Sequence, residues 1–184
     1  MITQYVFMTE EVSMERFLKI ALDKILPIDQ EIHHLIIPHE GKQDLEKSIP
    51  RKLRAWKNNN DIRYQFIIVR DKDSGNCAEI KTRISSLCRK AGRDDTFIII
   101  VIHELESWFL GDLNAVEKAY KINGIAKKQK QRLYRNPDAI ANASEQLAHI
   151  CNDTTKISRA ENITLKMDFD NNLSQSFNYF IRKM

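Results

Sequence analysis

Three groups of acidic residues stand directly after short apolar runs of the sequence. They are Glu10 with Glu11, Asp71 with Asp73, and Glu104 with Glu106. Carboxylates held close together repel one another unless a cation neutralises them. Oxygen ligands without a neighbouring histidine or thiolate suit Mg²⁺ or Mn²⁺ better than zinc. One or two such ions could activate water and stabilise the charge that develops in phosphodiester cleavage.

The apolar runs are predicted to be strands that alternate with amphipathic helices. Strands are predicted at residues 5–8, 32–37, 66–69 and 96–102, and helices at 13–26, 44–57 and 77–90, with another beginning within 103–110. The first helix has apolar side chains at helical spacing, with Ser13 as its N-cap and Pro27 ending it. Pro50 predicts a break or a fresh start within the second helix.

Strand and helix alternate through about the first 110 residues, which predicts an α/β fold with an open, mostly parallel sheet. Residues 96–102 are apolar on both faces and are expected to form a central strand. The carboxyl ends of parallel strands share one edge, where sites form, so the three acidic groups should converge there. Residues 1–112 would form this core. Residues 113–184 would form a helical C-terminal extension packed on it as one compact unit.

A structural interpretation of the acids stands beside the functional one. Acidic side chains before a helix are common because they favour its positive N-terminal end. Asp71 and Asp73 would point the same way in an extended chain. Ser74 and Gly75 would then let the backbone turn closely around a site.

The strand followed by Glu10, and the strand 66–69 followed by Asp71-Lys72-Asp73, resemble the Toprim pattern of topoisomerases, primases and overcoming-lysogenization-defect nucleases. Nearly the whole chain resembles the bacterial domain-of-unknown-function family 4276, which is grouped with Toprim-like proteins. The segments that carry this resemblance are 10–15, 52–56, 71–73 leading to Cys77 and Lys81, 104–112, 136–138, Lys156 and 172–177.

The resemblance implies a Toprim-like (Rossmann-like) core and Mg²⁺- or Mn²⁺-dependent chemistry on nucleic acid. Glu10 would be the Toprim glutamate, acting as general acid/base or further metal ligand, and Asp71 and Asp73 would be the catalytic metal pair. Glu104 and Glu106 belong to the family's own motif as additional metal ligands, with Glu106 preferred.

The function implied by the resemblance is a nuclease for DNA or RNA, the effector of an anti-phage defence system linked to a separately encoded AAA- or ABC-type ATPase. The alternative is a non-catalytic partner or sensor subunit of such an ATPase, because the sequence contains no P-loop of its own. Homo-oligomerisation is left open.

The net charge of +4 and the pI near 8.9 are mildly basic, which permits contact with nucleic acid. Lys127, Lys128, Lys130, Arg132 and Arg135 are predicted contacts, with Tyr134 as an aromatic among them. Arg70 would either pair with an acid or bind phosphate. Lys52, Arg54 and Lys57 form a second candidate contact. A solvated surface is the alternative interpretation of these charges.

The N-terminus lacks the features of a signal peptide, and the longest apolar run, 97–102, is too short to span a bilayer. We therefore expect a cytoplasmic protein without membrane contact. The three cysteines, Cys77, Cys88 and Cys151, form no CxxC pair and are expected to be reduced thiols.

Overall fold

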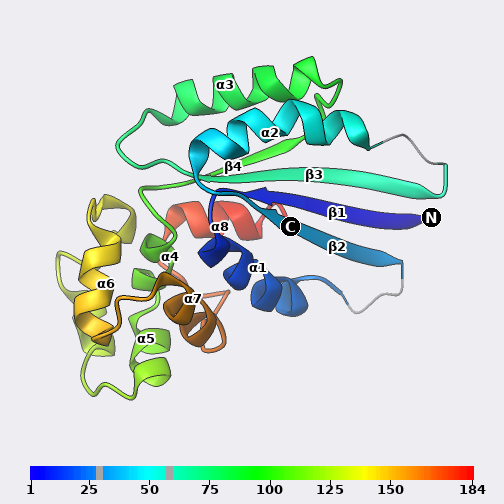
Figure 1. Cartoon of the computed structure of the whole chain (residues 1–184). Coiled ribbons are helices and arrows are strands. Elements are labelled where there is room, and N and C mark those ends of the chain that lie inside the picture. The colour runs from blue at the N-terminus through cyan, green and yellow to red at the C-terminus, as the bar shows by residue number, and fades with distance from the viewer. Residues whose placement is uncertain (28–30, 57–59) are drawn as a thin grey trace.

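The computed structural model describes residues 1–27, 31–56 and 60–184, so Lys57 lies outside the described residues. Strands and helices alternate as β1 (Ile2–Thr9), α1 (Val12–Ile25), β2 (Ile32–Pro38), α2 (Lys42–Ala55), β3 (Ile62–Asp71), α3 (Cys77–Lys90) and β4 (Phe97–Val101). They are followed by α4 (Glu106–Leu110), α5 (Leu113–Tyr120), η1 (Ala126–Lys130), η2 (Pro137–Ala139), α6 (Ala143–Cys151), α7 (Lys156–Thr164) and α8 (Gln175–Ile181). The predicted alternation is confirmed (Figure 1).

The four strands form one parallel sheet in the order β2-β1-β3-β4, an open α/β arrangement of the Rossmann-like kind. Thr9 lies in register with Pro38 and Val69, and Asp71 lies in register with Val101. The carboxyl ends therefore share one edge of the sheet, as predicted. We call it the carboxyl edge.

The prediction that residues 96–102 form a central strand is wrong, because β4 lies at the outer edge of the sheet. Its two faces are nevertheless covered, by α3 on one side and α8 on the other. A strand that is apolar on both faces is therefore one covered by helices on both faces. The pattern does not show whether the strand has a hydrogen-bonded neighbour along each edge.

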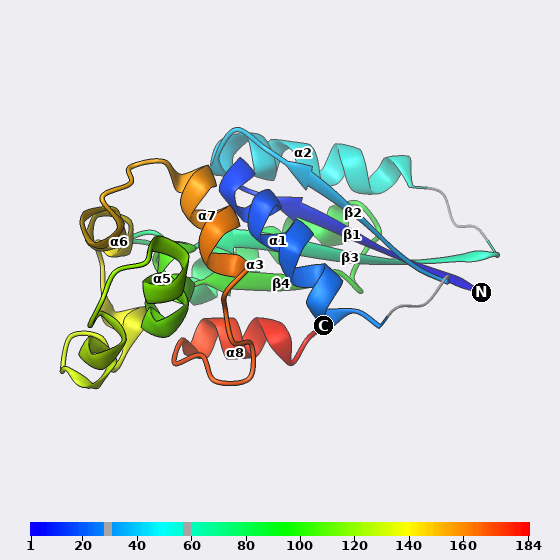
Figure 2. The same ribbon diagram turned by 90° about the horizontal axis from the view of Figure 1, so that it is seen from below.

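Helices pack on both faces of the sheet (Figures 1 and 2). Phe66 and Ile68 of β3 pack with the apolar faces of α2 and α3, whereas Ile67 and Val69 pack with α1 and α8. This alternation follows from the two-residue period of a strand. It also means that Arg70 and Asp71, the next two residues of β3, leave the strand toward opposite faces.

Helices α5 and α6 lie beyond the carboxyl edge in both views, and α7 lies beside α1 near that edge (Figures 1 and 2). Helix α7 packs against α1, and α6 packs against α4. The larger hydrophobic cluster runs without interruption from β1, β3 and β4 into α4 to α8. The C-terminal helices therefore form one wall of any site at this edge.

Two local predictions for the helices are wrong. Helix α2 continues through Pro50, and its residues Leu45, Ile49 and Leu53 pack on one face of the sheet on both sides of the proline. The packing of both halves offsets the one backbone hydrogen bond that proline cannot donate. The N-cap of α1 is Glu11, and the hydroxyl of Ser13 donates to the Glu11 carboxylate at 3.4 Å.

A buried polar network fixes α8 against α4. The indole Nε1 of Trp108 donates to the Ser176 hydroxyl at 2.8 Å, and the Ser176 amide donates to Asp138 at 2.9 Å. The side-chain amide of Asn172 donates to the backbone carbonyl of Trp108 at 2.8 Å. Gly111 is required there, because a Cβ atom would overlap the Asn172 side chain. These contacts give several residues of the sequence motifs a structural role.

All three cysteines are free thiols, as predicted. Burial raises the pKa of Cys88 to about 11 and that of Cys151 to about 12, so both thiols are poor nucleophiles. Among the described residues, every helix is too short or too polar to cross a bilayer.

Candidate functional site

The carboxyl edge gathers acidic side chains from the ends of three neighbouring strands. Glu10 follows β1 directly, Asp71 is the last residue of β3, and Glu106 begins α4 after β4. Glu10 is 9% exposed. Burial raises its pKa, the Asp73 carboxylate raises it further, and Arg70 together with a backbone hydrogen bond from Asp71 lowers it. Glu10 is thus coupled to both members of the predicted metal pair.

Asp71 is the most perturbed acid at this edge. Burial raises its pKa well above the ordinary value, and the carboxylates of Glu10, Glu106 and Glu11 raise it further. The Lys156 ammonium lowers it. A carboxyl group perturbed by burial and by several like charges is typical of functional sites.

Asp73 lies in a left-handed turn just beyond the strand, with φ of 51°. Its amide donates to the carbonyl of His103, which also has a left-handed φ of 60°. The extended backbone that would have pointed Asp71 and Asp73 the same way ends at Asp71, so that prediction is wrong. The Asp73 carboxylate instead accepts a hydrogen bond from Lys42 at 3.0 Å.

The turn after Asp73 is tight, as the Ser74-Gly75 pair predicted. A Cβ atom on Gly75 would lie 2.9 Å from Ile80 Cδ1 and 3.1 Å from the Lys72 carbonyl oxygen. The absence of a side chain at Gly75 therefore lets α3 pack closely against the turn. Asp73 and His103, joined by a backbone hydrogen bond, are both non-glycine residues in the left-handed region. Backbone strain of this kind clusters at functional sites.

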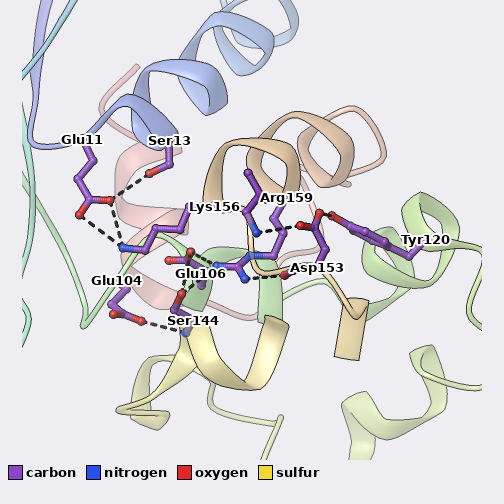
Figure 3. A network of polar contacts seen from close by, with 10 residues as sticks. Glu11, Ser13, Glu104, Glu106, Tyr120, Ser144, Asp153, Lys156 and Arg159 are labelled. Carbon is purple, nitrogen blue, oxygen red and sulfur yellow. Dashed lines mark hydrogen bonds and ion pairs between the residues drawn. The ribbon is translucent and has the colours of Figure 1, made fainter. Parts of the chain in front are cut away.

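The two glutamates after β4 have different environments (Figure 3). Glu106 is 2% exposed, and its Oε1 accepts from Arg159 Nη2 at 2.9 Å and from the Ser144 hydroxyl at 3.2 Å. Glu104 accepts from the backbone amide of Ser144 at 2.9 Å, near the N-terminus of α6. Glu106 is also among the acids that raise the pKa of Asp71.

Lys156 was not assigned a role by the sequence, yet its ammonium lies among these acids (Figure 3). Its Nζ lies 3.1 Å and 3.4 Å from the two carboxylate oxygens of Glu11. Burial lowers the pKa of Lys156, but the carboxylates of Glu106, Glu11 and Glu104 outweigh it and raise the pKa. Lys156 is the first residue of α7, where a positive charge opposes the helix dipole. A lysine at this unfavourable position indicates that its ammonium group has a specific acidic partner.

Arg70 was considered either a partner of an acid or a contact for phosphate, and the structure shows the first. Its side chain is 4% exposed, with Nε 3.5 Å from Glu46 and 3.9 Å from Glu10. Glu46 in turn pairs with Arg83 at 2.9 Å. The Nε and Nη1 atoms of Arg70 and the Oε2 atom of Glu10 are buried without a hydrogen bond. The Glu10 oxygen therefore retains an unused ligand position.

His39 follows β2 and completes the row of polar residues at the carboxyl edge. Its Nδ1 lies 2.9 Å from the carbonyl oxygen of Thr9, and its Nε2 lies 2.9 Å from Lys52 Nζ. A carbonyl only accepts and an ammonium only donates, so Nδ1 carries the proton and Nε2 accepts. The ring holds the backbone directly before Glu10. The half-buried Lys52 ammonium is thus hydrogen-bonded to His39.

The predicted nucleic-acid contacts Lys127, Lys128, Lys130, Arg132 and Arg135 are all exposed, on η1 and the segment that follows it. Tyr134 is only 6% exposed, so the prediction that it would offer an aromatic face beside these charges is wrong. Arg54 donates to the carbonyl of Lys90 at 3.2 Å. The basic segment is a charged surface without a stacking platform.

In the side-chain positions described, no three His, Cys, Asp or Glu residues surround a common point closely enough to hold a metal ion. The donor set still fits a hard divalent cation. Glu10, Asp71 and Asp73 supply oxygen ligands, and the Glu10 Oε2 atom accepts no hydrogen bond. Gathering them on one ion requires side-chain rotation, above all of Asp73 away from Lys42.

The comparisons with known proteins address the family of the chain. No curated protein and no solved structure matches it significantly. A family model described as a domain of unknown function (DUF4276) matches residues 9–184, nearly the whole chain. The chain therefore belongs to the DUF4276 family.

Proposed function

We propose that the protein is a Toprim-like nuclease that hydrolyses phosphodiester bonds of DNA or RNA with Mg²⁺ or Mn²⁺. The observation that carries this proposal is the coupling of Glu10, Asp71 and Asp73 at the carboxyl edge, where burial and mutual repulsion raise the pKa of Glu10 and Asp71. Repulsion of this kind is relieved when a divalent cation binds between the carboxylates.

Glu10, Asp71 and Asp73 would hold the ion, with Glu106 beside them. When bound, the ion supplies an activated water and offsets the charge of the phosphate. Burial and the Asp73 carboxylate raise the pKa of Glu10, so without a bound ion it holds a proton more readily than an ordinary glutamate. Arg159 holds Glu106 in place through its buried ion pair.

The test is cleavage of DNA and RNA by the purified protein, with and without Mn²⁺. We expect metal-dependent cleavage that Glu10→Ala and Asp71→Ala abolish while the far-UV circular dichroism stays unchanged. Asp94→Ala is the matched control, because Asp94 is exposed and forms an exposed ion pair with Arg89 at the far end of α3. Cleavage that persists in both site variants, or without metal, would remove the assignment.

We further propose that the protein acts in the cytoplasm beside a separately encoded ATPase of the AAA or ABC type in defence against phage. The free thiols support the cytoplasmic location. The family resemblance supports the ATPase partner and the role in defence. A functional pair should protect cells against phage, and the protection should depend on both the ATP-binding motif of the ATPase and Asp71.

The second candidate is a non-catalytic partner or sensor of that ATPase. The ammonium groups of Lys156 and Lys42 favour it, because they neutralise acids at the edge without any metal. Co-purification with the ATPase, together with no cleavage by the complex under any divalent metal, would favour this candidate. Cleavage by the purified protein alone would exclude it.

A further inference from the structure

The charged groups at the carboxyl edge fall into two sets. The first set contains Glu10 and Asp73, which are coupled to each other and face the cations of Arg70 and Lys42. The second set contains Glu11, Glu104 and Glu106, whose carboxylates act together on Lys156. Asp71 belongs to both sets, because it is coupled to Glu10 on one side and to Glu106 and Lys156 on the other.

The ammonium of Lys156 takes the place of a cation within the second set. Each of the three strand ends, after β1, β3 and β4, contributes at least one carboxylate that is coupled to it. The side chain reaches this place from α7, a helix outside the sheet, and is 37% exposed. A divalent ion could not occupy the same position without displacing the ammonium group.

The carboxyl edge also holds more acidic side chains than basic ones. Among the described residues, the acids coupled to one another here are Glu10, Glu11, Asp71, Asp73, Glu104 and Glu106. Their cationic partners are Lys42, Arg70, Lys156 and Arg159. Glu46 and Arg83 add one charge of each sign. Six carboxyl groups against four cations leave an excess of acidic groups at this edge, which favours a divalent cation.

We infer that the carboxyl edge binds a single divalent cation, at Glu10, Asp71 and Asp73, because Lys156 occupies the second cation position. The inference rests on the proposed function and deepens it. Two-metal sites hold their ions about 3.5–4 Å apart and need carboxylates for both. Here the carboxylates of the second position are neutralised by the chain itself. Lys156 is thus the residue that sets the number of metal ions.

The experiment counts bound Mn²⁺ by isothermal titration calorimetry and by electron paramagnetic resonance. We expect the wild-type protein to bind one ion with the spectrum of isolated Mn²⁺. Lys156→Met should bind two, with the exchange-coupled spectrum of a pair, because methionine keeps the length of the side chain and removes its charge. Lys156→Arg should bind one. Lys47→Met is the matched control, since Lys47 is exposed on α2, and should also bind one.

A second readout does not depend on activity. Without metal, Lys156→Met leaves the acids of the second set facing one another, so its Tm in EDTA should fall below that of Lys47→Met and recover with Mn²⁺. Two ions in the wild-type protein, or one in Lys156→Met, would overturn the inference while leaving the proposed function intact. Failure of the wild-type protein to bind any Mn²⁺ would overturn both.

Discussion

The guanidinium Nη2 of Arg159 lies 2.9 Å from Oε1 of Glu106, and the two side chains are 1% and 2% exposed. Arg159 also donates to the carbonyl of Asp153, just after α6, and to the hydroxyl of Ser144, at the start of α6. The one side chain therefore ties α7 to both ends of α6 and to the start of α4. A buried pair of this kind is costly to desolvate, but it fixes the geometry of the groups around it.

Removing Arg159 should therefore be far more damaging than removing an exposed arginine. Arg159→Met leaves the Glu106 carboxylate buried without its partner, and we expect the free energy of unfolding in urea to fall by about 3–5 kcal/mol. Arg89→Met, which breaks an exposed pair with Asp94, should be nearly neutral. Adding Glu106→Gln to Arg159→Met should recover part of the loss. Equal stability of the two single variants would contradict the buried pair.

Asp71→Asn should stabilise the metal-free protein. The folded-state pKa of Asp71 lies above its ordinary value of 3.8, so its contribution to stability is present below pH 3.8 and is lost as the pH rises through the folded pKa. At pH 7.5 in EDTA we expect a gain of about 1 kcal/mol, or about 2–4 °C in Tm. The gain should shrink as the pH falls.

The same variant should lose the rise in Tm that Mn²⁺ gives the wild-type protein. Asp94→Asn, at an exposed acid, is the control and should keep it. A metal-free Asp71→Asn protein that is less stable than wild type at pH 7.5 would show that the carboxylate is structural.

His39 should make the protein sensitive to acid. Burial lowers its folded-state pKa below the ordinary value of 6.5, so the stability it contributes is present above pH 6.5 and is lost as the pH falls through the lowered pKa. Between pH 7.5 and 5.5, the unfolding free energy of His39→Asn should fall less than that of the wild-type protein. His149→Asn, at an exposed histidine, should keep the wild-type slope. Parallel slopes for all three proteins would refute the role of His39.

The basic segment should contribute to nucleic-acid affinity through charge alone. Combined Lys127→Gln, Lys128→Gln and Lys130→Gln should weaken binding to any sequence and lower the slope of log K against log salt by about 2–3. The control combines Lys47→Gln, Lys81→Gln and Lys90→Gln, which are exposed on α2 and α3. Equal slopes for the two triple variants would place the nucleic acid elsewhere on the surface.

Hydrophobic periodicity predicted the helices well and the strands only in part. The bounds of α3 agree with the prediction because Asn76 caps its N-terminus and Ile80, Ile84 and Cys88 are buried on one face. Strand β3 begins four residues earlier than predicted, at Ile62 instead of Phe66. The first four residues of β3, Ile62–Gln65, are partly polar and yet pair with β1. Periodicity detects burial, whereas strand pairing depends on backbone hydrogen bonds that polar residues also make.

The acidic half of the site was predictable and the basic half was not. Parallel strands bring their carboxyl ends together, so the convergence of Glu10, Asp71 and Glu106 follows from the order of the elements. Lys156 and Arg159 reach the same place only because α7 packs on α1, a tertiary contact without a local sequence signal. The left-handed turn at Asp73 was also hidden, because Gly75 nearby was the more obvious turn residue.

The contact between Lys156 and Glu11 joins residues 145 positions apart. During synthesis on the ribosome, the whole sheet and its acids therefore emerge long before the helix that supplies Lys156 and Arg159. A nascent chain, or a product truncated before α7, carries the strand-end carboxylates without the cations that balance them. The site is thus completed only after α7 has followed the sheet out of the ribosome, and chains that end before α7 lack its basic half.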